Sequence, residues 1–435
     1  MCSSDLKTWV DANITIGPDA VNPVGSPHTF TVTVKQDAGD GNGLQVVSGA
    51  TITPTLSNSG GATATITGGT CISGTTNASG QCTIIVNSPT PGTATVDVSV
   101  TLTINGYEGS AQVTRATDGN SGPGGSDGAQ KSWVNARISI ESDATNEDNH
   151  PHTFTVTVEA DNGAGFAPVS GVTVTPAITN SLGATSTITG GTCTTTVTDA
   201  AGQCTIVINS PTTGKTVANA SATVTVNEVD ITVSTAGDGG TGPATKTWVN
   251  AGIIIIPSDT AGVGGTLTFT VRVCKDLGDG NGCVPAPGET VDPAIANIFG
   301  ATATITGGTC TTTTTDAAGE CTFTVSSPTT GRTPGNASVT LVVGGVTITR
   351  DTDPDSATPQ GPCGENCGPA IKTWVDANIV IGPDAVNEVG DPHTFTVTVK
   401  QDAGDGEGLV PAVGATVTPT LANSSGATAT VTGGT

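Results

Sequence analysis

A short phrase around tryptophan recurs four times in this chain, and it constrains the fold more than any other feature. All four tryptophans lie in a phrase of the type Lys-(Thr/Ser)-Trp-Val-(Asp/Asn)-Ala, and the phrases begin at Lys7, Lys131, Lys246 and Lys372. The tryptophans are 124, 115 and 126 residues apart, which is the size of a small domain. The sequence therefore predicts one domain copied in tandem, which favours roles based on length, spacing or multivalency.

The phrase and the segments between copies predict the domain boundaries. We expect repeats at 7–117, 131–235, 246–350 and 372–435, separated by linkers at 118–130, 236–245 and 351–371. The linkers are rich in Gly, Pro, Ser and Asp, so we expect them to act as tethers. The fourth copy stops where the earlier ones continue with Cys, so we expect it to be truncated. Residues 1–6 match no other copy and are interpreted as a non-native leader or sequencing scar.

The composition limits the classes of partner. The net charge is −24 and aromatic residues make up 3% of the chain, whereas nucleic-acid binding needs basic residues and stacking platforms. No apolar run approaches the ~18 residues that a membrane-spanning helix needs. The acidic excess favours solubility and cations such as calcium.

Alternating residues predict strands. Phe30, Val32 and Val34 face one way and the intervening threonines the other, which is the period of a half-buried strand. Further strands of the first copy are expected at 9–16, 50–56, 62–67, 82–86, 93–104 and 111–114. About seven short strands between Gly, Pro and Asn turns predict an all-β fold, a tandem array of Ig-like antiparallel β-sandwich domains. The expected core residues of the first copy are Trp9, Phe30, Val32, Ile66 and Ile84. A β-solenoid is the alternative, but its period of ~20–30 residues is not found.

The cysteines predict disulfides. Three pairs, each 11 residues apart, bracket a turn at the same place in three copies: Cys71/Cys82, Cys193/Cys204 and Cys310/Cys321. Two strands joined by that turn would bring the sulfurs together. Two more pairs occur once, Cys274/Cys283 and Cys363/Cys367. A zinc site would need four convergent ligands, which no copy offers. The regular pairs therefore indicate an extracellular or cell-surface protein.

The second half of each copy carries a family resemblance. The first copy reads Gly49-Ala50-Thr51-Ile52, then 76–84 as Thr-Asn-Ala-Ser-Gly-Gln-Cys-Thr-Ile, then 88–96 as Ser-Pro-Thr-Pro-Gly-Thr-Ala-Thr-Val. This pattern resembles the bacterial Ig-like repeats of the invasin/intimin type. The tryptophan phrase and the cysteine pair depart from that pattern. The resemblance implies a surface-displayed stalk, adhesin or fibre of a prokaryote, without catalytic residues.

Three loops gather oxygen atoms around glycines and offer a candidate calcium site. Their residues are Asp37, Asp40 and Asn42, Asp276, Asp279 and Asn281, and Asp402, Asp405 and Glu407. Calcium takes six to eight such oxygens from flexible loops. The alternative, which we favour, is a hairpin turn that uses Asp-Gly and Asn-Gly for positive φ. No cofactor other than calcium is expected.

The recurrent lysine allows a second hypothesis, an isopeptide bond to an asparagine such as Asn105 or Asn227, although these asparagines are imperfectly placed. His28, His152 and His393 are interpreted as strand-edge residues, because the third copy has Leu267 there. No Ser/His/Asp set, carboxylate pair or phosphate loop recurs, so we expect no enzyme.

These observations predict an extracellular structural repeat protein that forms a cell-surface stalk or the body of a fibre or filament. Its partners would be neighbouring copies of itself, in head-to-tail or strand-donating contacts, or a host or matrix surface. The alternative is an adhesin or carbohydrate-binding repeat module. Such a binder should expose an aromatic platform, and Tyr107 and Phe166 are candidate aromatic residues without counterparts in other copies.

Overall fold

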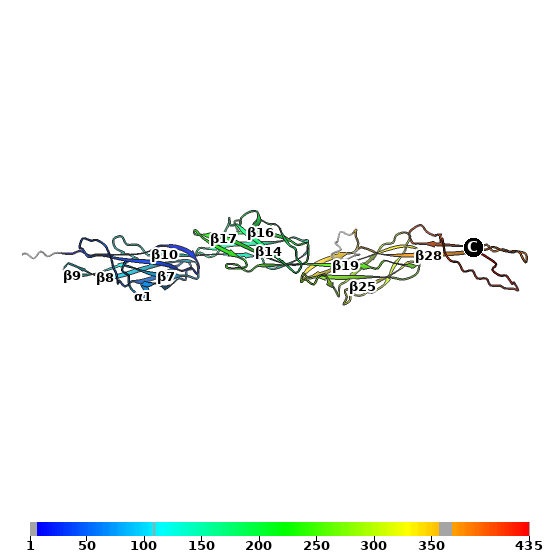
Figure 1. Ribbon diagram of the computed structural model, residues 1–435, viewed down its shortest axis with the longest axis horizontal. Helices are drawn as coiled ribbons and strands as arrows, with labels where there is room; N and C mark the ends of the chain where they lie inside the picture. The colour runs from blue at the N-terminus through cyan, green and yellow to red at the C-terminus, as the bar shows by residue number, and fades with distance from the viewer. Residues whose placement is uncertain (1–6, 108, 356–367, 435) are drawn as a thin grey trace, which may run out of the picture. The chain divides into compact units, whose positions relative to one another are not determined.

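The computed structural model describes residues 7–107, 109–355 and 368–434 (Figure 1). The chain divides into two compact units. The first consists of residues 1–144 and 149–247, and the second of residues 145–148 and 248–435. No helix in the described part of the chain is long and apolar enough to cross a bilayer.

The first copy is a sandwich of two sheets, as the alternating residues predict. One sheet has the order β1-β3-β7-β6, with β4 beside β3, and the other contains β5, β8, β9 and β2 together with β10. Figure 1 labels β7, β8, β9 and β10 in these two sheets. The bounds are β1 Asp11–Gly17, β2 Ala20–Pro23, β3 His28–Asp37, β4 Gln45–Val46, β5 Thr53–Ser59, β6 Thr65–Gly68, α1 Thr70–Ser73, β7 Gln81–Asn87, β8 Gly92–Gly106 and β9 Gly109–Ala116.

The second and third copies repeat this order. The second contains β10 Ala129–Ile140, β11 Ala144–Glu147, β12 His152–Asp161, β13 Ala167–Pro168, β14 Val174–Ser181, β15 Thr187–Gly190, η1 Thr192–Thr194, β16 Gln203–Asn209, β17 Gly214–Val226 and β18 Val229–Ser234. The third contains β19 Ala244–Ile256, β20 Asp259–Gly262, β21 Leu267–Asp276, β22 Val284–Pro285, β23 Val291–Ile295, β24 Thr304–Gly307, η2 Thr309–Thr311, β25 Glu320–Ser326, β26 Gly331–Val343 and β27 Val346–Asp351. In the described part of the fourth copy the strands are β28 Ala370–Gly382, β29 Thr396–Asp402 and β30 Val410–Pro411.

The core of the first copy lies between its two sheets. Phe30, Val32 and Ile84 are fully buried there, as predicted, while Ile66 is partly buried. Trp9 does not belong to this core, because 78% of its surface is exposed. The all-β, Ig-like fold class is therefore confirmed, but the expected position of the tryptophan in its own copy is wrong.

Four disulfides form between cysteines that the spacing pairs: Cys71–Cys82, Cys193–Cys204, Cys274–Cys283 and Cys310–Cys321. The first cysteine of each 11-residue pair lies in a short helical turn, α1, η1 or η2, rather than in a strand as expected. The disulfide therefore ties this turn to the following strand. Cys363 and Cys367 lie outside the described residues.

Candidate functional site: the strand-sharing junctions

One long strand serves two copies at once. Residues 129–133 of β10 pair antiparallel with β8 of the first copy, while residues 135–140 pair antiparallel with β12 of the second. A single sheet of nine strands results, with the order β15-β16-β12-β10-β8-β5 along its main path. The predicted boundary at residue 131 therefore falls inside a strand.

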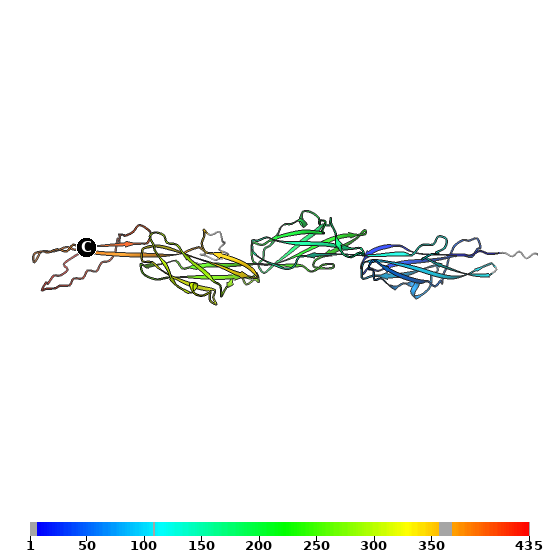
Figure 2. The same cartoon turned by 180° about the vertical axis from the view of Figure 1, so that it is seen from behind.

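The second unit contains the same arrangement. Residues 370–374 of β28 pair with β26 of the third copy, and residues 376–382 pair with β29 of the fourth. Figure 2 shows β28, in orange, running out of the yellow third copy toward the end of the chain. We call the segments Lys131–Val134 and Lys372–Val375 the docked phrases.

A second strand holds each docked phrase from the other side. β2 pairs with Lys131–Val134 in parallel, and the Val24 amide donates to the Val134 carbonyl at 3.0 Å. β20 holds Lys372–Val375 in the same way, and the Val263 amide donates to the Val375 carbonyl at 3.0 Å. Sequence reasoning missed these parallel pairs, because a four-residue strand that contains or adjoins turn residues shows no alternation.

The tryptophan of each docked phrase completes the core of the preceding copy. Trp133 is fully buried in the cluster that contains Phe30, and its indole nitrogen donates to the Ser26 carbonyl at 3.0 Å. Trp374 is fully buried with Phe269, and its indole nitrogen donates to Thr333 Oγ1 at 3.0 Å. A buried indole needs such an acceptor. The first copy is therefore finished by residues that the sequence assigns to the second.

The lysine of the docked phrase is buried as well. Lys131 and Lys372 are fully buried, and neither Nζ atom has a hydrogen-bond partner in the described structure. Burial lowers the pKa of the Lys131 amine to about 8. The Lys372 amine lies 4.8 Å from the centre of the Phe269 ring, which stabilises a cation without a hydrogen bond.

The structure offers no support for the isopeptide hypothesis. Lys131 lies in the core of the first copy. Asn227, its expected partner, is exposed in the turn between β17 and β18 of the second copy. Lys7 is exposed, and its amine lies 5.1 Å from the ring centre of Trp9.

The predicted linker 118–130 does not behave as a free tether. The Ile14 amide donates to the Ser121 carbonyl at 2.9 Å, and the Ile16 amide donates to Ser126 Oγ at 2.9 Å. The Asn13 side chain donates to the Pro123 carbonyl at 2.9 Å. The segment thus lies along the outer edge of β1 and satisfies backbone groups that would otherwise remain free.

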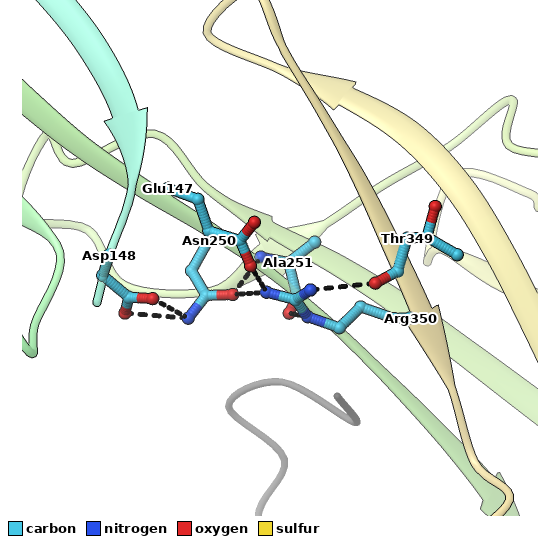
Figure 3. Close-up of polar contacts among 6 residues, drawn as sticks. All are labelled: Glu147, Asp148, Asn250, Ala251, Thr349 and Arg350. Carbon is cyan, nitrogen blue, oxygen red and sulfur yellow. Dashed lines mark hydrogen bonds and ion pairs between the residues drawn. The ribbon is translucent and has the colours of Figure 1, made fainter. Parts of the chain in front are cut away.

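An arginine on the last strand of the third copy anchors a segment from before that copy (Figure 3). The Arg350 side chain is 3% exposed, donates through Nε to the Ala251 carbonyl at 2.8 Å, and forms an ion pair with Glu147 at 2.5 Å. It also donates to the Asn250 side-chain oxygen. A buried charge is costly unless it is paired, so the buried Arg350 guanidinium needs the Glu147 carboxylate beside it. This ion pair ties Glu147 to the third copy, and residues 145–148 belong to the second unit.

The neighbouring carboxylate completes the cluster. The Asn250 side-chain amide donates to both oxygens of Asp148, at 3.0 and 2.8 Å. The first copy has a simpler version, in which Arg115 of β9 donates through Nε to the Ala12 carbonyl at 2.8 Å and forms an ion pair with Asp11. In both, an arginine of the last strand binds the two residues that directly follow the Trp-Val pair.

The candidate calcium loops are built as turns. The first aspartate of each loop accepts a hydrogen bond from an amide two residues on, and so does the second. The pairs are Asp37–Gly39, Asp40–Asn42, Asp276–Gly278, Asp279–Asn281, Asp402–Gly404 and Asp405–Glu407. The intervening glycines Gly39 and Gly41 have φ of 72° and 87°, which favours glycine. Among the described residues no group of three His, Cys, Asp or Glu side chains could hold a metal. Calcium binding stays a prediction.

One of these loops also makes a contact between copies, which sequence reasoning did not find. Asp402 Oδ2 accepts a hydrogen bond at 2.7 Å from Thr330 Oγ1 of the third copy. A Cβ atom on Gly404 would meet the carbonyl oxygens of Trp374 and Gly331, and one on Gly406 would lie 3.1 Å from the Phe299 ring. The loop 402–407 therefore packs against the end of the third copy.

Tyr107 and Phe166, the candidate binding aromatics, do not form a common platform. Tyr107 is 81% exposed at the turn after β8. In the second copy, the Arg137 guanidinium lies over the Phe166 ring, with its Cζ atom 4.2 Å from the ring centre. These surroundings differ, so they give little support to a repeated carbohydrate-binding surface.

No protein-family model and no curated protein matches this chain. Many solved structures are similar to it in part, including the following three. InvD of Yersinia pseudotuberculosis is 15% identical, with 90% of this chain and 92% of that chain covered and a TM-score of 0.23. The D0–D1 domain of intimin is 16% identical, with 54% and 94% covered and a TM-score of 0.18. The three N-terminal domains of the bacteriophage RB49 outer capsid protein Hoc are 10% identical, with 84% and 99% covered and a TM-score of 0.28.

Proposed function

We propose that this chain is an extracellular structural repeat protein that forms a cell-surface stalk or the body of a fibre. The observation that carries the proposal is the sharing of β10 and β28 between successive copies. A flexible tether lets neighbouring domains reorient, whereas a strand paired in two sheets joins two copies through backbone hydrogen bonds. Such joints favour a spacer or fibre over domains that act independently.

The disulfides support the proposed location. Four pairs are closed, three of them at the same place in successive copies. Disulfides persist in oxidising environments and are rare in the cytosol. The adhesin alternative, with a host or matrix surface as partner, would rest on loops and exposed aromatic residues. Among the described residues, the largely exposed aromatic rings are those of Trp9 and Tyr107.

The location is tested on intact cells of the source organism. Antibodies to the first copy should label unbroken cells or shed fibres, and unreduced peptides should contain the four disulfide pairs. Electron microscopy of the released material should show rods or fibrils. Free thiols at these cysteines together with labelling only after lysis would contradict the proposal.

A further inference from the structure

The joint between the first and second copies is a single strand that is held along its whole length. Lys131–Val134 of β10 pairs with β2 in parallel, and residues 129–133 pair antiparallel with β8. Beyond these pairs, residues 135–140 of the same strand pair with β12 of the second copy. β10 is one continuous strand of 12 residues, so tension between the two copies passes along its axis.

A pull along the axis of a strand loads its backbone hydrogen bonds together. These bonds lie across the strand direction, so β10 can slide out of the first copy only when its bonds to β8 and to β2 break at the same time. A pull across the strand would instead open the bonds one after another and meet less resistance. The geometry of this joint therefore favours resistance to tension.

A close contact beside the joint keeps the pull in line with β10. The loop that follows β12 lies against the end of the first copy. A Cβ atom on Gly163 of this loop would lie 2.8 Å from the Gly60 carbonyl oxygen and 2.9 Å from the Gly92 Cα atom. Glycine allows the two backbones to approach this closely. The contact limits how far the second copy can tilt in that direction and peel β10 away from its partners.

β2 shortens the path of tension through the first copy. β1 ends at Gly17 and β2 begins at Ala20. The covalent route from β1 to β2 is therefore two residues long, and from β2 the parallel pair leads directly to β10. Residues 25–128, which include the disulfide Cys71–Cys82, lie outside this path.

Hydrogen bonds close both ends of the parallel pair. Ahead of it, the Gln130 amide donates to Asp19 Oδ1 at 2.7 Å. After it, the Val24 amide donates to the Val134 carbonyl at 3.0 Å. These two bonds and the ladder between them join the strand that enters the first copy to the strand that leaves it.

The third copy repeats the arrangement at its joint with the fourth. β19 ends at Ile256, β20 begins at Asp259, and β20 pairs with Lys372–Val375 in parallel. The Ile371 amide donates to Ser258 Oγ at 3.0 Å, in the place of the bond to Asp19. Both joints thus use equivalent strands and close the parallel pair in the same way.

We propose that each shared strand carries tension between successive copies, and that the parallel pair of β2 with Lys131–Val134 sets the force at which the first copy opens. Opening under force is governed by the unfolding rate, so the contacts that break in the transition state decide it. This inference rests on the proposed function, because a stalk or fibre is pulled along its chain, and it names the contact that resists the pull.

The test pulls the full chain at constant force through tags at its two ends and measures the lifetime of the first copy. Cys71→Ser/Cys82→Ser identifies the step of this copy, because it releases an 11-residue loop and lengthens that step alone by about 3.5 nm. Val24→Pro removes the amide that donates to Val134. Because this bond breaks in the transition state under tension, the lifetime should fall about fivefold or more.

Val47→Pro is the matched control. Val24 and Val47 both pack on the core of the first copy, and the Val47 amide also donates at 3.0 Å, to the Val34 carbonyl. That bond lies outside the path of tension and stays intact in the transition state, so the lifetime should change less than about twofold. An equal effect of both substitutions, or no effect of Val24→Pro, would overturn the proposal.

A second pair of variants does not depend on how proline fits at position 24. Incorporation of the corresponding hydroxy acid replaces the Val24 or the Val47 amide by an ester, which removes the same donor and keeps the side chain. The ester at 24 should shorten the lifetime about fivefold, and the ester at 47 less than about twofold. Equal lifetimes or the reverse order would refute the role of β2, while antibody labelling of intact cells would still decide the proposed location.

Discussion

The phrases at Lys7–Val10 and Lys131–Val134 have almost the same residues and opposite surroundings. Trp133 is fully buried and Trp9 is 78% exposed, and only the second phrase forms a strand. The difference comes from the sheets that receive the phrase, because β8 and β2 flank Lys131–Val134. The comparison teaches that the unit repeated in sequence is not the unit that closes a core.

The largest expected effect comes from the tryptophans. Trp133→Ala should destabilise the first copy by about 3–5 kcal/mol, because it empties a buried site in that copy's core. Trp9→Ala, the matched change at the exposed phrase, should cost less than about 0.5 kcal/mol. Amide hydrogen exchange in β8 and β7 would measure both. If the second copy rather than the first lost protection in Trp133→Ala, the assignment of this residue to the first core would be wrong.

Replacing the lysines should give the next largest effect, and it should raise the stability of the first copy rather than lower it. Because burial lowers the pKa of Lys131 from 10.5 to about 8, the folded state disfavours the charged amine by roughly 3 kcal/mol. Lys131→Met keeps an apolar stem and should therefore stabilise the first copy by about 2–3 kcal/mol at pH 7. Lys7→Met, at an exposed site, should change little.

The same pair of variants has a pH signature. Between pH 8 and 10.5 the unfolded chain keeps the Lys131 proton that the folded chain has lost, so the stability of the wild type rises with pH. The advantage of Lys131→Met should be complete below pH 8 and vanish by pH 10.5. His28, which faces Lys131, has a pKa lowered mainly by burial and stays neutral in this window. An advantage independent of pH would mean that the amine is not the cause.

Aspartates at the loops should show a smaller contrast. Asp402→Ala removes the bond from Thr330 and the bond from Gly404, which should cost about 1–2 kcal/mol at the junction of the third and fourth copies. Asp37→Ala removes only the local bond from Gly39 among the hydrogen bonds described for its side chain, and should cost about half as much. The effect of Asp402→Ala is measured by cutting the chain at a protease site introduced within residues 356–367 and following the release of the fourth-copy fragment. The effect of Asp37→Ala is measured by hydrogen exchange in β1 and β3.

Calcium should give the smallest effect. If the loops are simple turns without a bound cation, the melting temperatures measured in millimolar calcium and in chelator should differ by less than about 1 °C. A bound cation would instead stabilise the folded state according to its affinity. A larger shift that Asp37→Ala and Asp402→Ala remove would establish the calcium site that the sequence predicts.

Local patterns predicted most of the fold because they act over a few residues. The alternation of Phe30, Val32 and Val34 predicts a strand and its buried face. The 11-residue spacing of Cys71 and Cys82 predicts the disulfide that closes the turn between them. A repeat period, however, says nothing about where one folded unit ends. Trp9 and Trp133 lie in nearly the same local sequence, and only the pairing with β8 assigns one of them to a preceding core.

The junction contacts were hidden for a similar reason. Asp402 and Asp37 lie in identical local sequences, but only Asp402 has Thr330 nearby. Ser121 and Ser126 lie in a segment whose composition is typical of a tether, while their partners Ile14 and Ile16 are more than 100 residues away. Polar contacts at such separation depend on the assembled sheets and leave no periodic signal.

The shared strand also sets an order of events on the ribosome. The first copy cannot bury its tryptophan until Trp133 has been made, about 17 residues after its last own strand ends at Ala116, which takes roughly 1–3 s at typical synthesis rates. During that interval its sheet edge at β8 is open. The first and third copies are thus each closed by the synthesis of the strand that follows them, and a pause or truncation at that point would release a chain with an open sheet edge.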